Sequence, residues 1–138
     1  MRMLLRRIIV GTCAGLLLSA GSLVPATGVD YVPGGRTAAI DQLLKPGCRH
    51  YHYRFRIDPP TDNWAAELFL VGPKGLGLGT AAYQGPQDPG LGRAAFRLCR
   101  SSITAGKYTI RMKITYKDGY DKYEGWVKPS HFRLLRRR

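Results

Sequence analysis

The sequence predicts an all-β protein, a single antiparallel β-sandwich of about six or seven strands that follows a signal peptide. Polar and apolar residues alternate in several segments, most clearly over residues 108–116. Turn residues separate these segments at the short intervals that are typical of a sandwich. Two cysteines, Cys48 and Cys99, frame most of the patterned part. Almost no helix is expected.

Residues 1–26 are typical of a signal peptide. Arg2, Arg6 and Arg7 precede an apolar run over residues 8–24, and Val24-Pro25-Ala26 offers a small-residue cleavage site. The alternative is an uncleaved membrane anchor, but glycines and serines lower the apolarity of the run. Cys13 precedes most of the apolar run, whereas a lipidated cysteine would follow it. We therefore expect a secreted, extracellular protein that contacts the membrane only through its signal peptide.

Removal of the signal peptide leaves two cysteines, Cys48 and Cys99, in the mature chain. In an exported protein two cysteines most simply pair with each other. The loop between them has about 50 residues, for which the chain-entropy relation gives a stabilisation on the order of 4 kcal/mol. The sequence therefore predicts a structural disulfide.

The segment over residues 27–47 is weakly patterned and is expected to be a linker or a weak N-terminal strand. Residues 37–44 are compatible with a short helical turn or with a first edge strand. Lys45-Pro46-Gly47 then breaks regular structure. The sandwich domain is expected to span residues 48–135.

The first expected strand covers residues 49–57, where apolar residues occupy the odd positions and polar residues the even ones. After a proline-rich turn, a more apolar strand follows over 64–71, with Glu67 on its solvent face. A glycine-rich, weaker strand is expected over 76–83. The segment 84–92 is a loop, and alternation resumes over 93–99. The inward residues of these strands are Tyr51, Tyr53, Phe55, Ile57, Trp64, Ala66, Leu68, Leu70, Phe96 and Leu98.

The clearest strand signal lies over residues 103–116, where Tyr108, Ile110, Met112, Ile114 and Tyr116 share one face. An Asp-Gly pair then predicts a hairpin turn. Two further strands are expected over 123–128 and 131–135, separated by a proline, and residues 136–138 form a basic tail.

Two short segments resemble secreted bacterial immunoglobulin-like modules, in particular the pre-peptidase C-terminal type. Residues 67–75 are similar to a strand followed by a Pro-x-Gly turn, and residues 105–111 are similar to a Gly-x-Tyr strand entry. The resemblance implies an immunoglobulin-like sandwich and a noncatalytic accessory module that binds a polymer or another protein.

The cysteines depart from the immunoglobulin pattern, in which the second cysteine follows the tyrosine by two residues. Here Cys99 precedes Tyr108 and ends the preceding strand. We therefore predict that the bridge joins two antiparallel neighbours within one sheet.

The mature chain is strongly basic, because 22 Lys and Arg residues stand against 9 Asp and Glu in the full sequence. This charge favours anionic partners such as cell-wall polymer or acidic polysaccharide. The basic residues are interspersed among several strands, which is typical of solvated outer faces, and no specific nucleic acid is expected. The alternative partner is another secreted protein, for an inhibitor or accessory subunit that uses the 84–92 loop.

The sharpest candidate binding surface lies around the predicted hairpin. It consists of four aromatic and two basic residues, namely Tyr116, Tyr120, Tyr123, Trp126, Arg111 and Lys113. Aromatic side chains that remain exposed can stack on sugar rings or anchor a protein partner.

Two weaker candidates are metal sites. His50 and His52 share a strand face, and Asp118 and Asp121 flank the hairpin, but neither pair matches a complete ligand set. No metal or cofactor is therefore expected. The mature serines lack a nucleophile-elbow pattern, so the protein is not expected to be an enzyme. The function predicted from sequence is a secreted, noncatalytic module that binds anionic polymer.

Overall fold

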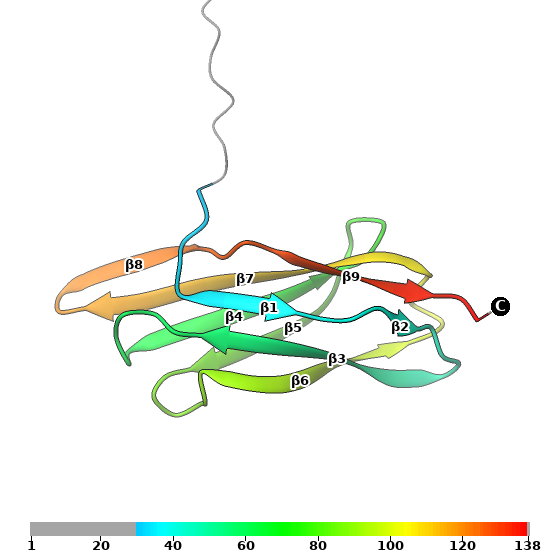
Figure 1. The fold of residues 1–138 in the computed structure, drawn as a ribbon, viewed down its shortest axis with the longest axis horizontal. Helices are drawn as coiled ribbons and strands as arrows, with labels where there is room; N and C mark the ends of the chain where they lie inside the picture. The colour runs from blue at the N-terminus through cyan, green and yellow to red at the C-terminus, as the bar shows by residue number, and fades with distance from the viewer. Residues whose placement is uncertain (1–29, 138) are drawn as a thin grey trace, which may run out of the picture.

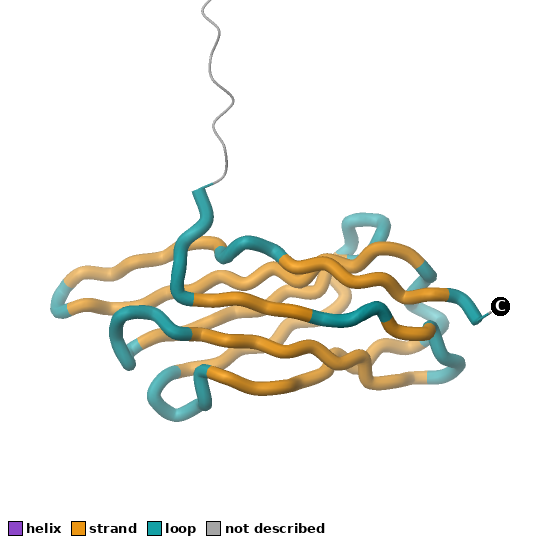
Figure 2. The backbone as a smooth tube through the Cα atoms, viewed as in Figure 1, coloured by secondary structure: helices purple, strands orange, loops and turns teal. Residues whose placement is uncertain are grey.

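The computed structural model describes residues 30–137, and this part of the chain consists of strands and loops (Figures 1 and 2). The predicted all-β sandwich is confirmed, with nine strands where about six or seven were expected. The strands are β1 Gly35–Ala38, β2 Gln42–Leu43, β3 Cys48–Ile57, β4 Trp64–Val71, β5 Gly77–Gln84, β6 Leu91–Cys99, β7 Gly106–Asp118, β8 Asp121–Trp126 and β9 Ser130–Leu135.

The strands form two sheets that pack face to face (Figure 1). The smaller sheet has the order β1-β3-β6. The larger sheet has the order β2-β9-β7-β4-β5, and β8 also pairs with β7. Strands β9 and β8 follow one another along the same edge of β7, because β9 pairs with its first half and β8 with its second half.

The core lies between the two sheets and is built by the alternation within each strand. The large side chains with the lowest exposure all come from the larger sheet, which places the centre of the core against β4, β7 and β9. From the smaller sheet, β3 and β6 contribute Tyr51, Tyr53, Phe55, Ile57, Phe96 and Leu98. From the larger sheet, β4, β7 and β9 contribute Trp64, Ala66, Leu68, Leu70, Tyr108, Ile110, Met112, Ile114, Phe132 and Leu134.

The weakly patterned segment before Cys48 contains two short strands. Strand β1 pairs antiparallel with β3, and β2 pairs parallel with β9. Of the two alternatives, the edge strand is therefore correct and the helical turn is wrong. The buried Thr37 hydroxyl is hydrogen-bonded to the Ser130 hydroxyl of β9, which ties β1 to the larger sheet.

The disulfide joins Cys48 and Cys99, which lie directly opposite each other at one end of the β3–β6 ladder. The predicted bridge between antiparallel neighbours of one sheet is confirmed. Residues 1–29, with the expected signal peptide and Cys13, lie outside the described residues, as does Arg138 of the tail. Within the described part, no helix is long and apolar enough to cross a membrane.

Candidate functional site

The aromatic residues expected to form one surface are divided among three places. Tyr116 and Tyr123 are directly opposed in the β7–β8 ladder, and their rings stack with centroids 5.0 Å apart. Trp126 is opposite Lys113 and therefore lies on the other face of the ladder. Tyr120 is in the turn and is fully exposed. The predicted six-residue surface is not a continuous one.

On the outer face of the larger sheet, the predicted binding residues Arg111, Lys113 and Trp126 have partners within the protein. The guanidinium carbon of Arg111 lies 4.1 Å from the centroid of the Trp126 ring, and Phe69 lies on the same ring at 5.8 Å between centroids. The Lys113 ammonium is 2.7 Å from a Glu124 carboxylate oxygen. Their hydrogen bond lowers the pKa of Glu124 and raises the pKa of Lys113. These side chains have partners, whereas Lys107 and Arg133 on the same face are exposed and directly opposed without a carboxylate partner among residues 30–137.

The outer face of the smaller sheet is different, because arginines from all three strands are exposed on it. We call this surface the arginine face, and its members are Arg36 of β1, Arg54 and Arg56 of β3, and Arg93 and Arg97 of β6. The ladder places Arg54 directly opposite Arg93 and Arg36 directly opposite Arg56. Basic residues that are dispersed along the sequence are therefore concentrated in space.

The arginine face has almost no compensating negative charge. Strands β1, β3 and β6 contain no acidic residue. Within residues 30–137, the ion pairs involve one residue of the face, Arg56, whose Nε is 2.9 Å from a carboxylate oxygen of Asp58 at the end of β3. The other four arginines point outward without a carboxylate partner in the described part of the chain.

His50 and His52 belong to the same outward face of β3 and are exposed among the arginines, since His50 is directly opposite Arg97. Asp118 and Asp121 are directly opposed at the end of the β7–β8 hairpin, on the other sheet. Among residues 30–137 no group of three or more His, Cys, Asp or Glu side chains gathers as a metal site would require.

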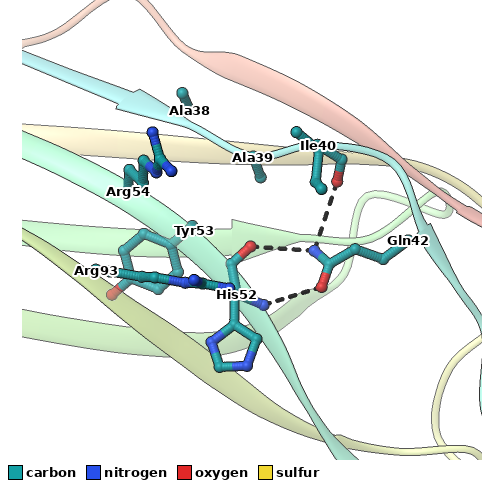
Figure 3. A pocket seen from close by; sticks show the side chains of 8 residues that line it. All are labelled: Ala38, Ala39, Ile40, Gln42, His52, Tyr53, Arg54 and Arg93. Carbon is teal, nitrogen blue, oxygen red and sulfur yellow. Dashed lines mark hydrogen bonds between the residues drawn. The ribbon is translucent and has the colours of Figure 1, made fainter.

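A cavity of about 420 Å³ opens at the centre of the arginine face (Figure 3). Its lining residues come from the end of β1, from β3 and from β6, and they are Ala38, Ala39, Ile40, Gln42, His52, Tyr53, Arg54 and Arg93. The cavity forms where β1 ends, because the chain leaves β3 after Ala38 and its Gln42 side chain next contacts the β3 backbone at His52.

The 84–92 loop, the expected contact element for a protein partner, is fastened to the sandwich. Near its start, Gly85 donates a backbone hydrogen bond to Trp64, and near its end Gly90 accepts one from Ile57. The carboxylate of Asp88 accepts a 2.8 Å hydrogen bond from the backbone of Gln84. A Cβ on Gly85 would clash with the Trp64 indole nitrogen, so this approach requires glycine.

Comparison with known proteins found no matching family model, no similar curated protein and no similar solved structure. The resemblance to pre-peptidase C-terminal modules therefore stays a prediction.

Proposed function

We propose that this protein binds an anionic polymer outside the cell, such as cell-wall polymer or acidic polysaccharide, through the arginine face. The observation that carries the proposal is the direct opposition of Arg54 and Arg93 on a sheet that contains no acidic residue. Like charges that face each other across a ladder destabilise a sheet. A polyanion laid across the face would remove this repulsion, because each guanidinium can donate paired hydrogen bonds to an oxyanion.

Two further features support this class of partner. The disulfide favours an oxidising, extracellular setting, where such polymers occur. Tyr51, Tyr53 and Phe55 point into the core, so the arginine face exposes no Phe, Tyr or Trp ring of the kind on which single-stranded nucleic acids stack their bases. The face is suited to a polymer that is recognised through its charge.

The test distinguishes binding through the arginine face from binding through the overall net charge of the protein. The double variant Arg54→Gln/Arg93→Gln removes two opposed charges from the face. The control variant Lys107→Gln/Arg133→Gln removes two exposed charges that are directly opposed on β7 and β9 of the other sheet. Both variants have the same net charge, and retention on immobilised polygalacturonate is measured at low and high salt.

We expect the wild type and the control variant to be retained at low salt and released as salt screens the charges. The Arg54→Gln/Arg93→Gln variant should elute at clearly lower salt. Equal weakening of both variants would assign binding to net charge and not to this face. A wild type that is retained neither on polygalacturonate nor on inorganic polyphosphate at low salt would refute the proposed function.

A further inference from the structure

We infer that the cavity beside Arg54 accepts one anionic sugar residue, so that the arginine face selects acidic polysaccharide over other polyanions. The inference rests on the proposed function, because it assigns a repeating unit to the polymer bound there. Three observations carry it: hydrogen bonds of Gln42 hold one wall of the cavity, its walls differ in chemistry, and it lies in the middle of the row of arginines.

The frame of the cavity is held by Gln42 (Figure 3). After β1 ends, the backbone of His52 has no strand neighbour on that side, and the Gln42 side chain takes the place of one. Its amide nitrogen donates to the His52 carbonyl at 3.0 Å, and its amide oxygen accepts from the His52 N–H at 3.1 Å. The polar atoms of Gln42 are thus committed to holding the wall, and the cavity is formed before any ligand arrives.

The two sides of the cavity have different chemistry. Ala38, Ala39 and Ile40 make an apolar side, and the Ile40 side chain is 80% exposed. Arg54 and Arg93 supply guanidinium groups, which donate hydrogen bonds and accept none. A complementary ligand therefore needs an apolar surface together with negatively charged acceptor oxygens.

A sugar ring that carries a carboxylate, sulfate or phosphate group meets both requirements. Its C–H groups can contact the apolar side, while its oxyanion and hydroxyl oxygens accept hydrogen bonds from the arginines. A bare inorganic anion would leave the apolar side without contacts. The volume of about 420 Å³ is within the range of small-molecule sites.

The position of the cavity fits a unit within a chain. Arg54 and Arg93 form the central row of the face, with Arg36 and Arg56 toward one end and Arg97 toward the other. From His50 to Arg56 the outward side chains extend over ~20 Å of strand. A polymer with one unit in the cavity can therefore place its neighbouring charges over the flanking arginines.

The test fills the cavity without changing charge. Ala38 is exposed on β1 and directly opposite Arg54, so Ala38→Phe places a ring in the cavity. The matched control is Ala82→Phe, at an exposed position of β5 in the larger sheet. Binding to polygalacturonate is compared with binding to inorganic polyphosphate, a polyanion without sugar. Thermal unfolding of each variant verifies its fold.

We expect Ala38→Phe to weaken polygalacturonate binding by about fivefold or more, the usual effect of losing one well-filled contact. Polyphosphate binding should be unchanged, and Ala82→Phe should affect neither polymer. If Ala38→Phe leaves polygalacturonate binding unchanged, the inference is wrong while the proposed function stands. If it weakens both polymers equally, the cavity is a general anion site and sugar selectivity is refuted.

Free sugars identify the anionic group. In methyl NMR spectra, galacturonic acid, galactose 6-sulfate and galactose 6-phosphate are each added to the wild type, with neutral galactose as the control. We expect at least one acidic sugar to shift the methyl signals of Ala38 and Ile40 while galactose does not, and the strongest response names the group. Equal shifts with galactose, or no shift with any acidic sugar, would overturn the inference.

Discussion

Replacing Arg54 with threonine should stabilise the protein, although it removes a residue of the proposed binding face. Arg54 is directly opposite Arg93 and is exposed, with no carboxylate partner among residues 30–137. Threonine suits a strand and carries no charge. The substitution therefore removes repulsion without leaving a buried group unpaired.

The size of the effect follows from the neighbours of Arg54. A directly opposed like-charge pair costs about 0.2–1 kcal/mol. Arg56 lies two residues along the same strand, about 7 Å away, and adds ~0.3 kcal/mol at 0.1 M salt after screening. The free energy of unfolding should therefore rise by about 0.5–1.3 kcal/mol, which corresponds to an increase in Tm of about 2 to 6 °C for a domain of this size.

Urea unfolding and thermal melts at low and high salt test this expectation. The gain should nearly vanish at 1 M salt, where the screening length falls to about 3 Å. The same substitution at Arg111 is the control, and it should destabilise the protein by about 0.5–1 kcal/mol because it removes the contact with the Trp126 ring. An Arg54→Thr variant that is less stable than the wild type, or a gain that is independent of salt, would refute the reasoning.

Three other perturbations have defined outcomes. The double variant Cys48→Ala/Cys99→Ala removes a disulfide that joins residues with a sequence separation of 51. Its free energy of unfolding, measured with urea, should fall by about 4 kcal/mol. A loss near zero would contradict the loop-closure reasoning. Burial, and then its 3.0 Å hydrogen bond to Tyr83, raise the pKa of Tyr53, so the wild type should lose stability as pH rises above about 10. Tyr53→Phe should lose about 1 kcal/mol at neutral pH but show a shallower alkaline decline in pH-dependent melts, and an equally steep decline would assign it to other groups. The pKa of Glu124 is lowered, so its contribution is fully present above pH 4.5 and is lost as pH falls through that lowered pKa. In acid titrations of stability, the difference between wild type and Glu124→Gln should therefore begin to shrink as pH falls below 4.5 and continue to shrink toward zero at lower pH. A difference that stays constant as pH falls well below 4.5 would contradict the ion pair as its cause.

Alternation in the sequence is sufficient to predict which side chains form the core. Tyr51, Phe55, Leu68 and Ile110 are all buried as their positions in the pattern indicate. Strand β1 is harder to predict, because four residues give too short a pattern to separate a strand from a helical turn. Alternation also predicts which face a residue occupies, but it does not say which strand lies beside it.

The arginine face could not be predicted from alternation, because alternation does not say which strands are neighbours. The positions of the two cysteines do contain the missing information. Once Cys48 and Cys99 are treated as a directly opposed pair, each step forward along one strand is matched by a step backward along the other. Six steps then lead to Arg54 on one strand and to Arg93 on the other, which is the observed pair. The predicted aromatic residues are close in sequence, but Tyr123 and Trp126 lie on opposite faces of the β7–β8 ladder, so closeness in sequence does not bring them onto one surface.

The β3–β6 ladder has a disulfide at one end, and the like-charged Arg54 and Arg93 are directly opposed farther along it. A reductant and the polymer of the proposed function would therefore act on the same two strands with opposite effects on stability. On the proposed function, bound polymer would stabilise only the folded ladder, so by mass action it should protect the bridge from reduction and preserve the fold after the bridge is broken. The proposed ligand would thus hold the two strands together noncovalently, and the protein should survive a reducing environment longest where an anionic polymer that it binds is abundant.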